Sequence, residues 1–110
     1  MRPKLVPLSE TMHLILLALR EPLHGYRIMQ LVSEMSKGEV NIAAGTLYGA
    51  LENLKKHGYI ELLSEPSDRK KIYQTTKLGK EILANENKRL KEIVTLYEKG
   101  LIYRGEYIIN

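Results

Sequence analysis

Apolar positions with helical spacing predict the first two helices of the chain. Ser9 is a favourable N-cap, and the apolar stripe that follows it ends at Glu21-Pro22. A second helix is expected to open at His24-Gly25-Tyr26 and to close at Ser36–Glu39. The apolar residues of these two helices are Met12, Ile15, Leu16 and Leu19, then Ile28, Leu31, Val32 and Met35.

The next stretch predicts a third helix followed by a hairpin. Leu47, Leu51 and Leu54 fall on one face of a helix beginning near Gly45, and Gly58 supplies a stop that tolerates a left-handed backbone. Two short strands are expected over residues 60–65 and 71–75, joined by a turn at residues 66–68. A brief additional strand is expected over residues 40–42.

A long terminal helix is predicted over residues 77–99, with Thr76 as its N-cap. At about 1.5 Å per residue it is roughly 35 Å long, more than a small head domain covers. Its apolar stripe therefore needs a partner, most simply a second copy of the chain, although a helix folded back on its own head is the alternative. The stripe consists of Ile82, Leu83, Leu90, Ile93, Val94 and Tyr97, interrupted by Glu86 and Asn87.

These elements predict an α+β, mainly α fold with two parts. Residues 1–76 are expected to form a winged helix-turn-helix DNA-binding domain, and residues 77–110 a C-terminal dimerisation helix and tail. The segment 101–110 is unusually apolar, which leaves open whether it wraps across a partner subunit or caps a cavity. Tyr26, Tyr59 and Tyr73 are expected to pack in or beside the core, and His24 to cap or pack.

Composition narrows the function without deciding it. The net charge is +4 over 110 residues, which favours an acidic partner only modestly, and the compact basic clusters are Lys55-Lys56 and Arg69-Lys70-Lys71. No apolar run approaches a membrane span of about 18 residues, and there is no cysteine, so a cytoplasmic protein is expected. The three histidines share no metal-ligand spacing, and no catalytic motif occurs, so neither an enzyme nor a metal or cofactor site is expected.

The ordered set of motifs resembles the PadR family of transcriptional regulators. The resemblance covers residues 12 to about 83 and runs through His24-Gly25-Tyr26, Gly45-Thr46-Leu47-Tyr48, Leu51, Leu54, Gly58, the basic wing ending in Tyr73, and Thr76-x-x-Gly79. Gly49 stands where the family commonly has Pro. The length of the last helix is similar to the smaller subfamily, which implies a dimeric repressor that responds to small hydrophobic or aromatic compounds.

The layout places the expected DNA contacts on the third helix and the wing. In a dimer, two copies of that helix would enter successive major grooves of a pseudo-palindromic, double-stranded operator. The helix start would read bases, while the wing tip would contact phosphates or the minor groove. The expected DNA-binding residues are Thr46, Tyr48, Asn53, Lys56, Arg69, Lys70 and Lys71. Tyr48 could equally well cover the edge of the core instead of contacting DNA. Lys55-Lys56 could equally well form a solvated helix end.

The dimer interface and an effector site are expected on the last helix. The interface would use Leu83, Leu90, Ile93 and Tyr97. A small hydrophobic or aromatic effector would bind at the dimer centre, lined by His13, Ile82, Glu86, Leu90, Val94 and Tyr97, and a filled dimer core without a cavity is the alternative.

A DNA-binding transcriptional regulator, and specifically a ligand-modulated dimeric repressor, is thus the function that the sequence favours. A winged-helix module for protein–protein contact comes second, because fold alone does not decide function. The basic wing tip argues against this second interpretation. A small-molecule carrier comes third.

Overall fold

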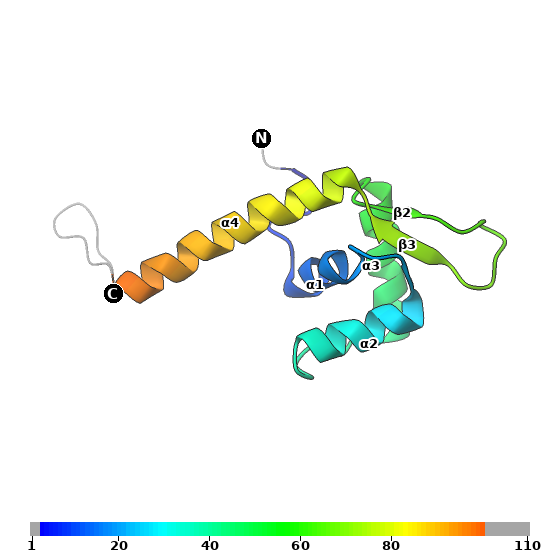
Figure 1. Ribbon diagram of the computed structural model, residues 1–110, viewed down its shortest axis with the longest axis horizontal. Coiled ribbons are helices and arrows are strands. Elements are labelled where there is room, and N and C mark those ends of the chain that lie inside the picture. The colour runs from blue at the N-terminus through cyan, green and yellow to red at the C-terminus, as the bar shows by residue number, and fades with distance from the viewer. Residues whose placement is uncertain (1–2, 101–110) are drawn as a thin grey trace.

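A computed structural model describes residues 3–100, which form four helices and a small antiparallel sheet (Figure 1). The fold is therefore α+β and mainly helical, as predicted. The elements are α1 (Glu10–Ala18), β1 (Leu23–His24), α2 (Gly25–Met35), α3 (Ala44–Lys56), β2 (Ile60–Leu62), β3 (Ile72–Thr75) and α4 (Lys77–Lys99). The predicted tail at 101–110 lies outside the described residues.

Side-chain caps begin the first and the last helix, and both were predicted. The Ser9 hydroxyl accepts a hydrogen bond from the Met12 N–H at 3.1 Å, and the Thr76 hydroxyl accepts one from the Gly79 N–H at 3.0 Å. Each bond satisfies a backbone donor that the helix itself leaves without a partner. Helix α3 ends before Gly58, whose φ of +79° is the left-handed conformation that glycine adopts readily.

The sheet contains one strand that the sequence pattern did not predict. Strand β3 lies in the centre, pairing antiparallel with β2 on one side and with the two-residue β1 on the other. The expected strand over residues 40–42 is wrong. That segment is a loop, in which the Val40 N–H donates to the Ser36 hydroxyl at 2.9 Å and the Asn41 amide donates to the Gly38 carbonyl at 2.7 Å. These local bonds satisfy the loop without a strand partner.

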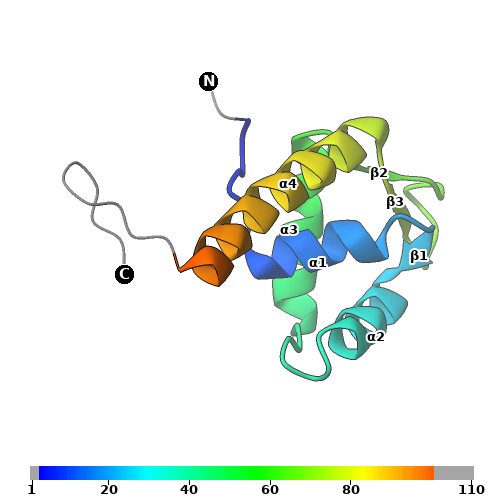
Figure 2. The ribbon, with the colours of Figure 1, turned by 60° about the vertical axis from the view of Figure 1, so that its left-hand side comes forward.

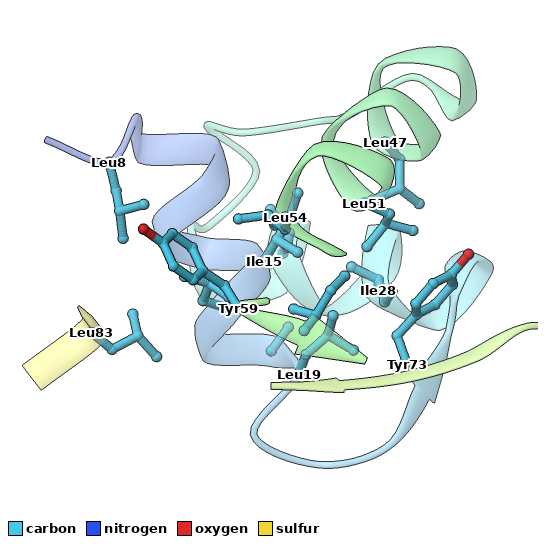
Figure 3. Close-up of a cluster of buried hydrophobic side chains, with 14 of the residues drawn as sticks. Leu8, Ile15, Leu19, Ile28, Leu47, Leu51, Leu54, Tyr59, Tyr73 and Leu83 are labelled. Carbon is cyan, nitrogen blue, oxygen red and sulfur yellow. The ribbon is translucent and has the colours of Figure 1, made fainter. Parts of the chain in front are cut away.

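The core lies between α1, α2, α3, the sheet and the first turns of α4, and the part of the protein before α4 is called the head below. Figure 3 shows Leu83 from α4 and Tyr73 from β3 at opposite ends of this cluster. Tyr59 and Tyr73 are buried as expected, whereas Tyr26 is 61% exposed, so the expectation that it packs is wrong. Successive residues of a helix point about 100° apart, so Tyr26 faces solvent when Gly25 and Ile28 face the core. The fully buried large side chains are Ile15, Leu16, Leu19, Ile28, Val32, Leu47, Leu51, Leu54 and Ile60.

Helix α4 packs on the head over its first half and projects beyond it over its second half (Figures 1 and 2). A close approach at Gly79 allows this packing, because a Cβ there would collide with the Tyr59 carbonyl oxygen. Ile82 and Leu83 are buried, and from Leu90 onward the apolar side chains are exposed. The helix therefore leaves its own domain partway along its length.

The segment before α1 lies against α4 and the end of α3. The buried Glu86 carboxylate accepts a hydrogen bond from the Leu8 N–H at 2.7 Å, and the Tyr59 hydroxyl donates to the Lys4 carbonyl at 2.5 Å. These two bonds join residues that are 78 and 55 positions apart in the sequence. These bonds connect the N-terminal segment to the point at which α4 departs from the head.

Candidate nucleic-acid interface

Helix α3 presents its N-terminal turn to solvent while its other face is fixed in the core. Leu47, Leu51 and Leu54 are fully buried, and this anchoring leaves Thr46 and Tyr48 exposed at the opposite side. An apolar stripe on one side of a helix fixes which residues face outward. The predicted base-reading turn is consequently accessible.

Helices α2 and α3 begin without a side-chain cap. His24 at α2 and Ala43 at α3 make no side-chain capping bond, and neither helix has an acidic residue in its first turn. Helices α1 and α4, by contrast, start with hydroxyl caps. The first backbone N–H groups of α2 and α3 therefore keep their partial positive charge available to an anion such as a phosphate.

Three chain segments meet in a cationic hollow beside the start of α2. The hollow has a volume of about 360 Å³. Its residues come from the start of α2, from α3 and from the wing, which is the β2–β3 hairpin extending from the head in Figure 1. The lining residues are His24, Gly25, Tyr26, Tyr48, Arg69, Lys70 and Lys71. Four predicted DNA-binding residues are thus brought together, and three residues that sequence reasoning did not assign to the site join them.

Gly25 and Tyr48 explain how the hollow is shaped. A Cβ on Gly25 would lie 2.5 Å from the Tyr48 hydroxyl oxygen, so any larger residue there would displace the tyrosine. The absence of a side chain lets α3 approach the start of α2 closely. Tyr48 therefore lies between the two uncapped helices, and it is 46% exposed. The His24-Gly25-Tyr26 motif signals a close approach at Gly25, but the motif alone does not reveal that Tyr48 is the residue that approaches.

The three wing cations do not play the same structural part. The Lys71 ammonium donates to the carbonyl oxygens of Asp68 (at 2.7 Å) and Pro66, so it holds the wing turn together. The Asp68 carboxylate accepts from the Glu65 N–H at 3.1 Å and closes the same turn. Among the described residues, no ion pair engages Arg69 or Lys70. These two side chains are exposed and carry the positive charge that the wing offers to a ligand.

Two predicted contact residues lie outside the hollow. Asn53 is half-buried and Lys56 is exposed near the C-terminal end of α3, and neither lines the hollow. Lys55 forms an ion pair with Glu52 at 3.3 Å, as suits a solvated helix end.

Tyr73 lies buried on β3 close to this surface. Its pKa is raised, first because burial disfavours the phenolate and then because Glu52 and Tyr48 lie nearby. The hydroxyl therefore stays protonated. Tyr73 supports the strand that carries the wing, with β1 and β2 paired against it at Leu23 and Leu62.

The residues predicted for the dimer interface and the effector site divide into covered and exposed groups. Ile82, Leu83 and Glu86 are 5%, 6% and 3% exposed because the head covers them. His13 is half-buried on α1. The remaining predicted residues, Leu90, Ile93, Val94 and Tyr97, are exposed on the projecting half of α4.

Glu86 is the charged residue at the boundary between these groups. The Arg89 guanidinium donates two hydrogen bonds to its carboxylate, at 3.0 and 3.1 Å. Arg89 lowers the pKa of Glu86, the Leu8 N–H and nearby His13 add to this effect, and burial opposes it. Glu86 is thus a satisfied structural carboxylate in this structure.

Other functional chemistry is not evident in the part of the chain that the structure describes. Residues 3–100 contain no group of three or more potential metal-ligating side chains placed to hold an ion. Over the same residues, no helix combines the length and apolar character required to cross a membrane.

Comparisons with known proteins identify the family of the chain. The sequence model of the transcriptional regulator PadR-like family matches residues 14–85. None of the curated proteins matches the chain in sequence.

Several solved structures with similar folds are described as transcriptional regulators. A PadR family transcription regulator from hypervirulent Clostridium difficile has 22% identity and a TM-score of 0.68, over 83% of this chain and 97% of that one. A transcriptional regulator from Clostridium thermocellum has 22% identity and a TM-score of 0.67, over 82% and 90%. A PadR family regulator from Eggerthella lenta has 27% identity and a TM-score of 0.64, over 80% and 78%.

Proposed function

This chain belongs to the PadR-like family of transcriptional regulators, and from that premise we propose that it is a cytoplasmic, dimeric repressor whose operator binding responds to a small effector. The coarser function is that of a DNA-binding regulator rather than an enzyme. The finer proposal concerns which residues touch DNA, how two copies pair and where an effector acts.

The observation that carries the DNA-binding proposal is the convergence of the wing, α2 and α3 on one cationic hollow. Arg69 and Lys70 supply charge, and Tyr26 and Tyr48 supply hydroxyl groups beside the uncapped start of α2. A backbone phosphate presents several acceptor oxygens, which match this set of donors. With the phosphate held there, the exposed start of α3, including Thr46, is directed at the adjacent bases.

The test is DNA binding as a function of salt with a charge-matched control. We expect Arg69→Ala/Lys70→Ala to weaken binding to DNA from the region upstream of the chain's own gene. Its slope of log K against log salt should become shallower by about 0.9 for each phosphate that the variant no longer neutralises. Lys88→Ala/Lys91→Ala removes the same charge from exposed positions of α4 and should leave the slope unchanged. Equal losses of affinity in the two variants would show that bulk charge, and not the wing, binds DNA.

A further variant tests the contribution of the Tyr48 hydroxyl independently of the wing cations. Tyr48→Phe keeps the ring beside Gly25 and removes only the hydroxyl. We expect a fall in DNA affinity of about 1 kcal/mol, the worth of one hydrogen bond. Unchanged affinity would instead mean that Tyr48 only packs between α2 and α3.

The dimer proposal is supported by the exposed stripe of α4. Leu90, Ile93, Val94 and Tyr97 continue the face that Ile82 and Leu83 bury against the head. Contiguous exposed apolar surface of this kind is unfavourable in an isolated subunit. A second copy related by a two-fold axis would cover the stripe with its own equivalent stripe and would place two α3 helices for a pseudo-palindromic operator.

A groove beside this stripe supports an effector site. It has a volume of about 380 Å³ between α1 and α4 and is lined by Leu8, Glu10, His13, Leu14 and Leu90. Two of these residues, His13 and Leu90, were predicted as effector ligands, and the exposed Val94 and Tyr97 follow along α4. A small hydrophobic compound in this groove would change the angle between head and helix, and hence the half-site spacing, provided that it favours one spacing over the other.

A further inference from the structure

A second groove between α1 and α4 differs from the first in its charge. It has a volume of about 360 Å³, and His13 forms part of both grooves. Its lining is His13, Leu17, Arg20, Lys80, Leu83, Ala84 and Asn87. It therefore combines three basic residues and an amide with three aliphatic side chains, and it contains no carboxylate.

The basic residues of this groove are not neutralised by the protein around them. The ion pairs among the described residues are Arg27–Glu34, Lys55–Glu52 and Arg89–Glu86, so neither Arg20 nor Lys80 takes part in one. Glu86, the buried carboxylate nearest His13, is already bound by Leu8 and Arg89. Unbalanced cations along one groove favour an anionic occupant.

Arg20 is held at its position in the groove wall. Its Nε donates to the Leu17 carbonyl at 3.1 Å, and its own carbonyl accepts from the Gln74 amide at 3.4 Å. Arg20 therefore lies just beyond the end of α1 and lines the groove together with Lys80 from the first turns of α4. Its planar guanidinium can donate two parallel hydrogen bonds to a carboxylate.

We propose that this groove binds a small monocarboxylate with an aliphatic body. The carboxylate would be held by Arg20 and Lys80, with Asn87 able to donate a further hydrogen bond. The aliphatic body would lie on Leu17, Leu83 and Ala84. A cavity of a few hundred cubic ångströms with an apolar floor and a few polar groups is typical of small-molecule sites.

Binding in this groove would also act on DNA recognition, a consequence that rests on the proposed function. Arg20 belongs to the head and Lys80 to α4, so one ligand joins the DNA-binding domain to the proposed dimerisation helix. A ligand that contacts both elements favours one angle between them, and it shifts operator affinity if that angle differs between the bound and unbound protein.

The first test measures binding without DNA. Cyclohexanecarboxylate and its neutral amide, cyclohexanecarboxamide, have the same shape and differ in charge. Titration of the full chain, followed by backbone amide NMR shifts, is expected to move resonances of Leu17, Leu83 and Asn87 with the acid. The amide should bind at least about tenfold more weakly. Equal binding of the two compounds, or no shifts in the groove up to about 10 mM acid, would overturn the proposal.

Variants locate the binding in this groove. Arg20→Gln/Lys80→Gln removes the two charges, and Ala84→Leu fills the apolar floor without changing charge; each should weaken acid binding at least about tenfold. Lys91→Gln, an exposed change on the same helix outside the groove, should have no effect. Thermal melting confirms that each variant is folded. Equally weakened binding in Lys91→Gln, or unchanged binding in Ala84→Leu, would place the acid elsewhere.

The second test measures DNA affinity with saturating acid. Wild type should change its operator affinity by about threefold or more, whereas Arg20→Gln/Lys80→Gln should not respond. If the acid bound without any change in DNA affinity, the proposed regulation of DNA binding would be overturned, whereas the proposed carboxylate site would stand. If wild type bound no DNA, the proposed function would fail, and the titration without DNA would still decide whether the groove is a carboxylate site.

Discussion

The two halves of α4 have the same apolar pattern and opposite surroundings. In the first half, Ile82 and Leu83 are 5% and 6% exposed, whereas Ile93 and Tyr97 in the second half are 50% and 87% exposed. The first half packs on α1 and β3, and the second half extends past α1, α2 and α3 (Figure 1). The difference shows that periodicity specifies a face for burial without specifying which molecule buries it.

The largest expected effect is in the half that the head covers. Leu83→Ala removes a buried side chain and leaves a cavity, so the free energy of unfolding should fall by about 2–4 kcal/mol. The decrease should be the same at low and high protein concentration, because the packing lies within one chain. Urea unfolding at two concentrations checks this. A decrease that appeared only at high protein concentration would show that Leu83 lies in the interface between two copies.

The second effect is expected in the projecting half. Ile93→Asp places a charge in the proposed apolar interface, and burying an unpaired carboxylate is costly. We expect the dimer dissociation constant to rise by about 100-fold or more, with the unfolding of the isolated subunit unchanged. Sedimentation equilibrium measures the constant. A variant that remained dimeric at micromolar concentration would show that the copies pair through another surface.

An intermediate effect is expected at Glu86, on the boundary between the halves. Glu86→Gln keeps an acceptor for the Leu8 N–H and loses the charged bonds from Arg89, which should cost about 1–2 kcal/mol near pH 7.

The pH dependence of this effect has a definite sign. The folded state lowers the pKa of Glu86 through its bonds to Arg89 and Leu8. Its contribution is therefore complete above the ordinary glutamate pKa of about 4.3 and is lost as the pH falls through the lower, folded value. Urea unfolding between pH 7 and 3 should show this decrease in wild type and not in Glu86→Gln. Parallel curves would show that Glu86 is not the titrating group.

The smallest effect is expected at Leu96, which matches Ile93 closely in exposure, at 49% against 50%. Leu96 lines a surface hollow with Lys91 and Thr95, at the border between the stripe and the polar side of the helix. Leu96→Gln should change both unfolding and dimerisation by less than about 0.5 kcal/mol. If Leu96→Gln weakened the dimer as much as Ile93→Asp, the result would show that the interface also includes Leu96.

The sequence alone determined the helices, the caps and the wing, because these depend on neighbours in the chain. Ser9 and Thr76 cap the helices that they were expected to cap, and α4 has its predicted bounds. Helical spacing at Leu47, Leu51 and Leu54 placed one face of α3 in the core and thus Thr46 at the surface. Each of these features follows from contacts within a few residues.

Only the tertiary structure decided which distant residues meet. Strand β1 exists because Leu23 and His24 pair with β3, far later in the chain, and so the third strand was predicted at the wrong place. The start of α2 is likewise near the wing only once the sheet has formed, which brings Tyr26 into the cationic hollow with Arg69 and Lys70. The period of the apolar residues predicts which face of a helix or strand is buried, but it does not predict which element covers that face. That is decided by packing between residues far apart in the sequence.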